Sequence, residues 1–235
     1  LTVGGLSSVA GSVLASFVGI GIDITHLLTA VVLSSVSALV VSKIIIPETE
    51  ESETFGTCKI EPEQNASSVI EAFTNGAMDG LKLALTIAGL LIAFIAGIAL
   101  INGLLAQIGP YIGVQALSLE LIMGYVFAPI AWLQGIPVED IHAAGSLLGK
   151  KLVSNEFIAY IDLVKMQNEL NPRTVKILIY GLCGFTNMSA YAILLGSISE
   201  IAPEKKQVMS KFVFKALFGG TCACLITGCI AGILL

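Results

Sequence analysis

The residues best suited to chemistry in this chain are a neighbouring amide and carboxylate, Asn155 and Glu156, in a sequence that is 55% hydrophobic and 12% charged. Holding a carboxylate among hydrocarbon costs roughly 2.5–3.5 kcal/mol on membrane-insertion scales. A carboxylate accepts hydrogen bonds and an amide both donates and accepts them, so the pair suits the vicinal hydroxyl groups of a sugar. The default interpretation is therefore a site for a polar ligand or an ion at membrane depth.

Two further apolar segments carry uncharged polar residues. Ser7, Ser8 and Ser12 lie in the first segment, and Asn187 follows Gly184 by three positions in the other. This composition favours local breaks in two membrane helices, and a broken helix frees backbone N–H and C=O groups to bind a small ligand or a cation. The alternatives are hydroxyl groups that bond back to their own helix and an Asn187 side chain that joins two helices.

Long uncharged runs indicate which elements position these groups. A spanning helix needs ~20 mostly apolar residues. Runs of about that length or more contain no Asp, Glu, Lys or Arg at 1–22, 24–42, 83–119, 177–199 and 216–235. The sequence therefore predicts an all-α integral membrane protein in a lipid bilayer, with spanning helices, broken helices and a re-entrant helical hairpin.

The hairpin is predicted from the segment that contains Glu156. Charged residues recur through 138–167, and neither 138–149 nor 155–167 is long enough to cross a bilayer alone. Two half-length helices that meet beside Asn155 indicate a re-entrant hairpin, which is tolerated at membrane depth where protein or a water-filled cavity surrounds it. The alternative is an ordinary helical hairpin in the cytoplasm.

Loop charge predicts the orientation in the membrane. Lys43, Lys59 and Lys82 lie in one connection, which we therefore expect in the cytoplasm, and 107–137 holds no Lys or Arg, so we expect it outside. We divide the chain into 1–47, two membrane helices of which the first is broken; 48–80, an acidic cytoplasmic loop and an interfacial helix; 81–106, a spanning helix; 107–137, an external loop and an interfacial helix; 138–167, the re-entrant hairpin; 168–199, a broken membrane helix; and 200–235, the last membrane helix.

Several functions are excluded by composition. The net charge is −5 and no basic cluster or nucleic-acid motif occurs, so nucleic acid is not an expected partner. No nucleophile or metal-binding cluster neighbours Glu156 in the sequence, which argues against an intramembrane enzyme. The first residues already read as the inside of a hydrophobic segment, so we expect the chain to be the later part of a longer protein.

Seven short motifs, in order along nearly the whole chain, carry a resemblance to a known family. They are SSVAGSVL at 7–14, HLLTA at 26–30, PETE at 47–50, NEFIAY at 155–160, GLCGFTN at 181–187, APEKK at 202–206 and TGCIAGIL at 227–234. Together they make the chain resemble the C-terminal part of a concentrative nucleoside transporter.

The resemblance implies a cation-coupled importer of nucleosides that works by alternating access. It implies a multi-pass homotrimer in the plasma (inner) membrane, in which a mobile transport domain that includes 1–47 moves against a scaffold that includes 81–106. It implies no cofactor beyond a coupling cation, Na⁺ or H⁺. The family's first re-entrant hairpin, which reads the base, is absent from this sequence, so purine or pyrimidine preference is left open.

The resemblance also assigns roles to residues. Glu156 and Asn187 would bind ribose hydroxyl groups, Phe185 would pack nearby, and Val13 would lie beneath the base. The implied substrate-binding residues are Glu156, Asn187, Phe185, Val13, Asn155 and Ser189, and the implied cation-binding residues are Ser8 and Val9.

One position departs from the family. Ala190 stands where the family usually has a ribose-contacting Ser, and Ser189 lies one residue earlier. If the backbone is unchanged, Ser189 points elsewhere, which puts the ribose preference in question. Ala190 also keeps open an alternative function, a gated pore or a ligand-sensing membrane protein on the same scaffold.

Overall fold

A computed structural model describes residues 2–49 and 67–235, and over these residues it contains helices and no strand. Most of the acidic loop predicted within 48–80 therefore lies outside the described residues. In chain order, the elements are α1 (Thr2–Ser7), α2 (Gly11–Gly19), α3 (Ile24–Ile45), α4 (Val69–Ile108), η1 (Gly109–Ile112), α5 (Leu119–Leu133), η2 (Val138–Asp140), α6 (Ile141–Val153), α7 (Glu156–Met166), α8 (Pro172–Leu182), α9 (Met188–Ile201), η3 (Pro203–Lys205), α10 (Lys206–Lys211) and α11 (Val213–Leu234).

The prediction of an all-α membrane protein is confirmed. Four stretches of the described chain are long and apolar enough to cross a membrane, at Thr2–Gly19, Ile24–Ile45, Val69–Ile112 and Val213–Leu234. The first of these is divided into α1 and α2, and α6 and α7 form a hairpin of two helices that are each shorter than a span.

The bounds of α3 follow from local chemistry. Asp23 caps its first turn by accepting a hydrogen bond of 2.7 Å from the backbone N–H of Thr25. Hydrogen bonds from Thr25 also lower the pKa of the Asp23 carboxyl, so the cap stays ionised near neutral pH. The helix ends at Ile45, two residues before Pro47, which cannot continue a helix.

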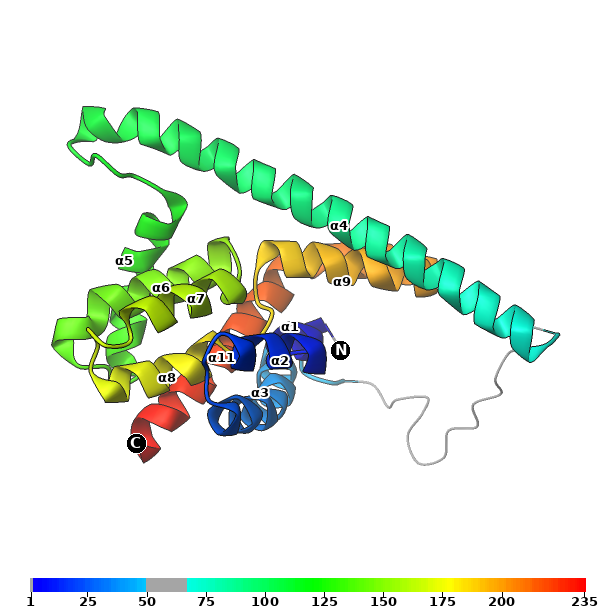
Figure 1. Cartoon of the computed structure of the whole chain (residues 1–235), viewed down its shortest axis with the longest axis horizontal. Coiled ribbons are helices and arrows are strands. Elements are labelled where there is room, and N and C mark those ends of the chain that lie inside the picture. Colours follow the sequence, from blue (N-terminus) through cyan, green and yellow to red (C-terminus); the bar gives the residue numbers. More distant parts are fainter. Residues whose placement is uncertain (1, 50–66) are drawn as a thin grey trace.

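The longest helix differs from the prediction of a separate interfacial helix within 48–80 and a spanning helix at 81–106. The structure has one helix of 40 residues, α4, over both ranges. Ser68 caps its start by accepting a hydrogen bond from the backbone N–H of Glu71, and the Glu71 carboxylate accepts from the backbone N–H and the hydroxyl of Ser67. No proline interrupts the helix. None of its described residues is buried, and Figure 1 shows most of α4 running apart from the other helices; it lies along α9 and also contacts the start of α5 through Asn102.

The hairpin packs closely against α5. The α5 and α6 backbones touch where Gly145 of α6 meets Gly124 of α5, since a Cβ added at Gly145 would lie 2.6 Å from the Gly124 carbonyl oxygen. In the main core, Phe17 of α2 packs against Tyr160 of α7, with the rings tilted and their centroids 4.6 Å apart. The hairpin is therefore held between α5 on one side and the broken first helix on the other.

The chain after the hairpin contains a second broken helix, α8 followed by α9, and then a short α10 before α11. Residues 183–187 form the break between α8 and α9. The last membrane segment, which we predict at 200–235, is divided because Phe212 separates α10 from α11. Figure 1 shows α11 passing through the centre of the molecule, where it contacts α1, α3 and α8.

Candidate functional site

Three interruptions in the helices meet near the centre of the molecule: the α1–α2 break, the α8–α9 break and the turn between α6 and α7. Thr186 joins the first two of these. It lies in the α8–α9 break, and its hydroxyl donates to the carbonyl of Leu6 at the end of α1 with an O···O distance of 3.0 Å. Gly184 has φ +124°, and a Cβ there would lie 2.8 Å from the Ser7 carbonyl oxygen and 2.7 Å from Cys224 Sγ. Glycine is therefore required where these two breaks cross.

Two asparagines begin the second halves of the broken elements. Asn155 Oδ1 accepts from the backbone N–H of Ile158 at 2.8 Å, and Asn187 Oδ1 accepts from the backbone N–H of Ala190 at 2.7 Å. Both side chains thus cap helix N-termini, those of α7 and α9. The caps use one lone pair of each amide oxygen and leave the amide nitrogens to donate to other groups.

Glu156 joins the hairpin to the α8–α9 break. Its Oε2 accepts a hydrogen bond from Nδ2 of Asn187 at 3.1 Å, and both side chains are 2% exposed. Glu156 lies in the first turn of α7 and contacts the N-cap of α9, so two positive helix ends face its charge. The carboxylate can accept further hydrogen bonds, and Asn187 has a second N–H to donate.

A buried lysine ties the hairpin to α8. Lys151 of α6 is 5% exposed, and its Nζ donates to the carbonyl of Gly181 at 3.1 Å. Gly181 lies in the last turn of α8, where a positive charge is favourable. The hairpin tip is thus tied to α8 as well as to α9.

The pair opens into a cavity of about 630 Å³. All six residues expected to bind substrate line it: Val13, Asn155, Glu156, Phe185, Asn187 and Ser189. Ser8 and Val9, expected to bind the cation, do not line this cavity and lie instead in the unwound turn between α1 and α2. The structure therefore gathers the expected substrate-binding residues around one cavity, whereas the two expected cation-binding residues are not part of its lining.

Some cavity residues are missing from the sequence-based set. Ser16 and Ser197 add hydroxyl groups, and Ile87 and Leu91 of α4 form part of the wall. Nothing in the sequence linked α4 to the hairpin, because the contact depends on how α4 lies along α9. Ala190 also lines the cavity, next to Ser189, whose side chain is 5% exposed.

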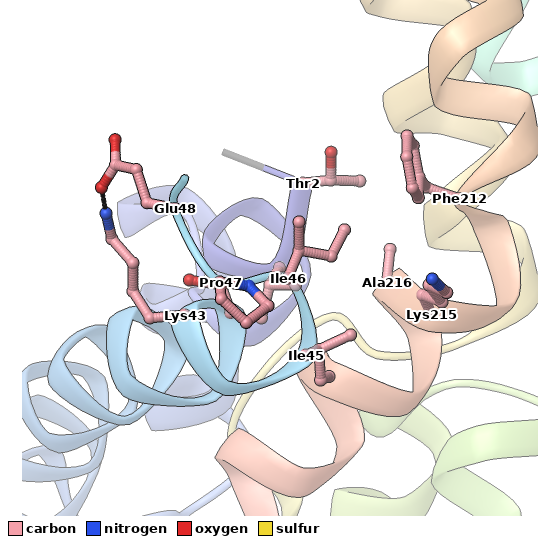
Figure 2. Close-up of a pocket in the computed structure, with 11 residues that line it drawn as sticks. Thr2, Lys43, Ile45, Ile46, Pro47, Glu48, Phe212, Lys215 and Ala216 are labelled. Atoms are coloured by element: carbon pink, nitrogen blue, oxygen red, sulfur yellow. Dashed lines mark ion pairs between the residues drawn. The ribbon is translucent and has the colours of Figure 1, made fainter. Parts of the chain in front are cut away.

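A second cavity, of about 370 Å³, lies away from these residues (Figure 2). It is formed by the start of α1, the end of α3 and the start of α11. Figure 2 shows Lys43 paired with Glu48 on one side and Lys215 beside Phe212 on the other. It contains none of the residues expected to bind substrate or cation.

The family described as Na⁺ dependent nucleoside transporter C-terminus matches residues 26–232. The chain belongs to this family. The resemblance carried by the sequence motifs is thereby confirmed. Family members are transporters, which agrees with the expectation that the chain is not an enzyme.

Curated relatives of this nucleoside-transporter chain include bacterial and human proteins. It is 41% identical over 229 residues to the uncharacterized transporter YutK of Bacillus subtilis (strain 168), a match covering 97% of the chain and 57% of YutK. It is 36% identical over 255 residues to sodium/nucleoside cotransporter 1 of Homo sapiens, covering 98% of the chain and 38% of that protein. The chain therefore spans just over half of the length of YutK and well under half of the length of the human protein.

Solved structures of CNTnw share the fold of this transporter-family chain. A CNTnw variant in the intermediate 3 state gives a TM-score of 0.86 at 35% identity, covering 99% of this chain and 57% of that one. CNTnw in an inward-facing substrate-bound state gives 0.79 at 36% identity, covering 99% and 55%.

Proposed function

We propose that this chain supplies one part of the substrate site of a longer transporter that imports nucleosides together with a cation. The observation that carries the proposal is the buried Glu156–Asn187 hydrogen bond at the edge of the 630 Å³ cavity. Family membership makes a nucleoside the substrate class that this geometry should serve.

The polar and apolar parts of the cavity match the two parts of a nucleoside. Glu156 would accept hydrogen bonds from ribose hydroxyl groups, and the amide nitrogens of Asn155 and Asn187 would donate to the hydroxyl oxygens. Phe185 and Val13 add apolar walls suited to the flat base. Ser8 and Val9 would contribute oxygen atoms to the coupling cation from the unwound turn between α1 and α2, where helical bonding is incomplete.

Transport would proceed by alternating access, driven by the cation gradient. The names of the CNTnw structures describe outward-facing, intermediate and inward-facing states, and the fold of this chain is similar to the structure in each of these states. One cation entering down ~100 mV releases about 2.3 kcal/mol. That is enough to sustain roughly a 40-fold solute gradient, at about 1.4 kcal/mol per tenfold.

The assembly we propose is a homotrimer in the plasma membrane. Support comes from α4, whose described residues are all at least partly exposed although it is strongly apolar. An apolar helix that leaves its own subunit uncovered suits contact with lipid and with neighbouring subunits.

Uptake of labelled uridine and adenosine by vesicles containing the complete protein tests this function. We expect accumulation with an inward sodium gradient at neutral pH and its loss when sodium is equal on both sides. Accumulation that follows a proton gradient instead would show that the coupling cation is H⁺. No accumulation of any nucleoside, or an ionic current far above the rate of nucleoside entry, would reject the importer and favour a gated pore.

A further inference from the structure

A carboxylate outside the substrate cavity contacts the hairpin tip. Glu120, in the first turn of α5, accepts a hydrogen bond on Oε1 from the hydroxyl of Ser154 at 3.1 Å. Its Oε2 accepts from Nδ2 of Asn102, in α4, at 2.9 Å. The Asn102 Oδ1 in turn accepts from the backbone N–H of Leu119 at 2.9 Å. Three separate elements are therefore joined through one side chain.

The charge of Glu120 is directed at neutral donors. Within the described chain, no Lys, Arg or His forms an ion pair with it. Its position in the first turn of α5 stabilises the negative charge through the helix dipole. A hydroxyl that donates to a carboxylate forms a stronger bond than one that donates to a neutral acceptor, so the bond to Ser154 is suited to holding a turn in place.

Ser154 is the residue on which the hairpin turns. It follows the last residue of α6 and precedes Asn155, which caps α7, and Glu156, which bonds Asn187. The backbone contact between Gly124 and Gly145 fixes α5 relative to α6. Glu120 therefore reaches the tip from a helix that is already rigidly placed against the hairpin.

From this geometry we propose that Glu120 is a positioning residue for substrate binding. It holds Ser154, and through that turn it sets the direction in which Asn155 and Glu156 enter the cavity. Asn102 orients the Glu120 carboxylate from α4. The inference rests on the proposed function, because the effect is expected in nucleoside affinity.

The test uses the complete protein in vesicles and compares Ser154→Ala with Ser154→Thr, which keeps the hydroxyl. We expect Ser154→Ala and Glu120→Ala each to raise the KM for nucleoside uptake by about 5–10-fold, with the maximal rate within about twofold. Ser154→Thr and the exposed control Glu139→Ala should behave like the unmodified protein. The variant that combines Ser154→Ala with Glu120→Ala should be no worse than Glu120→Ala, since both changes remove the same Ser154–Glu120 bond.

Hydrogen exchange supplies a readout that does not depend on transport. In Ser154→Ala, the amide of Ile158, which bonds the Asn155 cap, should exchange faster, while amides within α8 should not change. An unaltered KM and unaltered exchange in Ser154→Ala, or additive losses in the double variant, would overturn the proposal. If the unmodified protein transports no nucleoside, the proposed function fails, and the exchange measurement still decides whether Glu120 holds the tip.

Discussion

At the scale of single residues, the Glu156–Asn187 bond decides what the cavity can bind. Glu156→Gln keeps the size of the side chain but replaces a charged acceptor with an amide, whose N–H₂ group can face the N–H₂ of Asn187. We expect the variant in the complete protein to lose nucleoside uptake while its thermal stability stays close to that of the unmodified protein. Labelled-uridine uptake and a melting curve measure the two effects.

Glu139→Gln is the matched control for that substitution, because Glu139 is exposed and does not line the cavity. It should retain full uptake. Near-normal uptake by Glu156→Gln would remove Glu156 from the substrate site.

The neighbouring positions 189 and 190 offer a second test at this scale. Both residues line the cavity, and Ala190 has no hydroxyl group. We expect Ala190→Ser to tighten nucleoside binding by about 0.5–1.5 kcal/mol, the net value of one hydrogen bond. Ser189→Ala is the paired variant. If Ala190→Ser leaves the Kd unchanged or raises it and Ser189→Ala weakens binding, Ser189 has taken over the contact.

At the scale of helices, the sequence predicts those elements whose ends are set locally. The span predicted from Ile24 agrees with α3 because Asp23 caps its start and Pro47 stops it. Asn187 follows a glycine in an apolar run, and that pattern correctly indicated a break in the helix. The order of the elements around Glu156 can therefore be predicted from the sequence.

Features that depend on contacts between distant segments could not be predicted from the sequence. Gly76 and Gly80 lie at the end of the interfacial helix that we predicted within 48–80, yet α4 continues through them into the predicted spanning helix. Glu120 is visible as a charge in an apolar stretch, but its bond to Ser154 spans 34 residues of sequence. The burial of Lys151 likewise follows from the packing of α6 against α8, which no local pattern specifies.

A helix-scale prediction concerns the close packing of α5 on α6. In Gly145→Ala the new Cβ would lie 2.6 Å from the Gly124 carbonyl oxygen and 2.8 Å from the Ala128 nitrogen, both backbone atoms that cannot turn aside. We expect a loss of about 1–3 kcal/mol in stability, as in other overpacked contacts. Thermal unfolding of the purified protein in detergent measures it.

Gly4→Ala serves as the comparison, since a Cβ at Gly4 meets no atom within 4 Å. Its unfolding temperature should match that of the unmodified protein. Equal unfolding temperatures for Gly145→Ala and Gly4→Ala would show that the two helices can separate at little cost.

At the scale of the whole molecule, α4 is the element that the rest of this chain does not cover. Gly89 and Gly97 lie in its apolar part, and a Cβ at either meets no atom within 4 Å in this subunit. If neighbouring subunits of the proposed trimer approach there, Gly97→Leu should weaken that assembly and leave each subunit folded. Light scattering of the complete protein in detergent gives the mass of the assembly. An unchanged trimer with Gly97→Leu would place the subunit contact elsewhere.

Asn187 both caps α9 and bonds Glu156, and this has a consequence for how such a protein ages. Slow hydrolysis of its side-chain amide to aspartate would leave an oxygen to cap α9, so the fold would survive. The same event would remove the donor that faces Glu156 and set a second acid 3.1 Å away, where the nitrogen had been. Old molecules would then keep the cap of α9 and yet carry two facing acids where the cavity needs a donor.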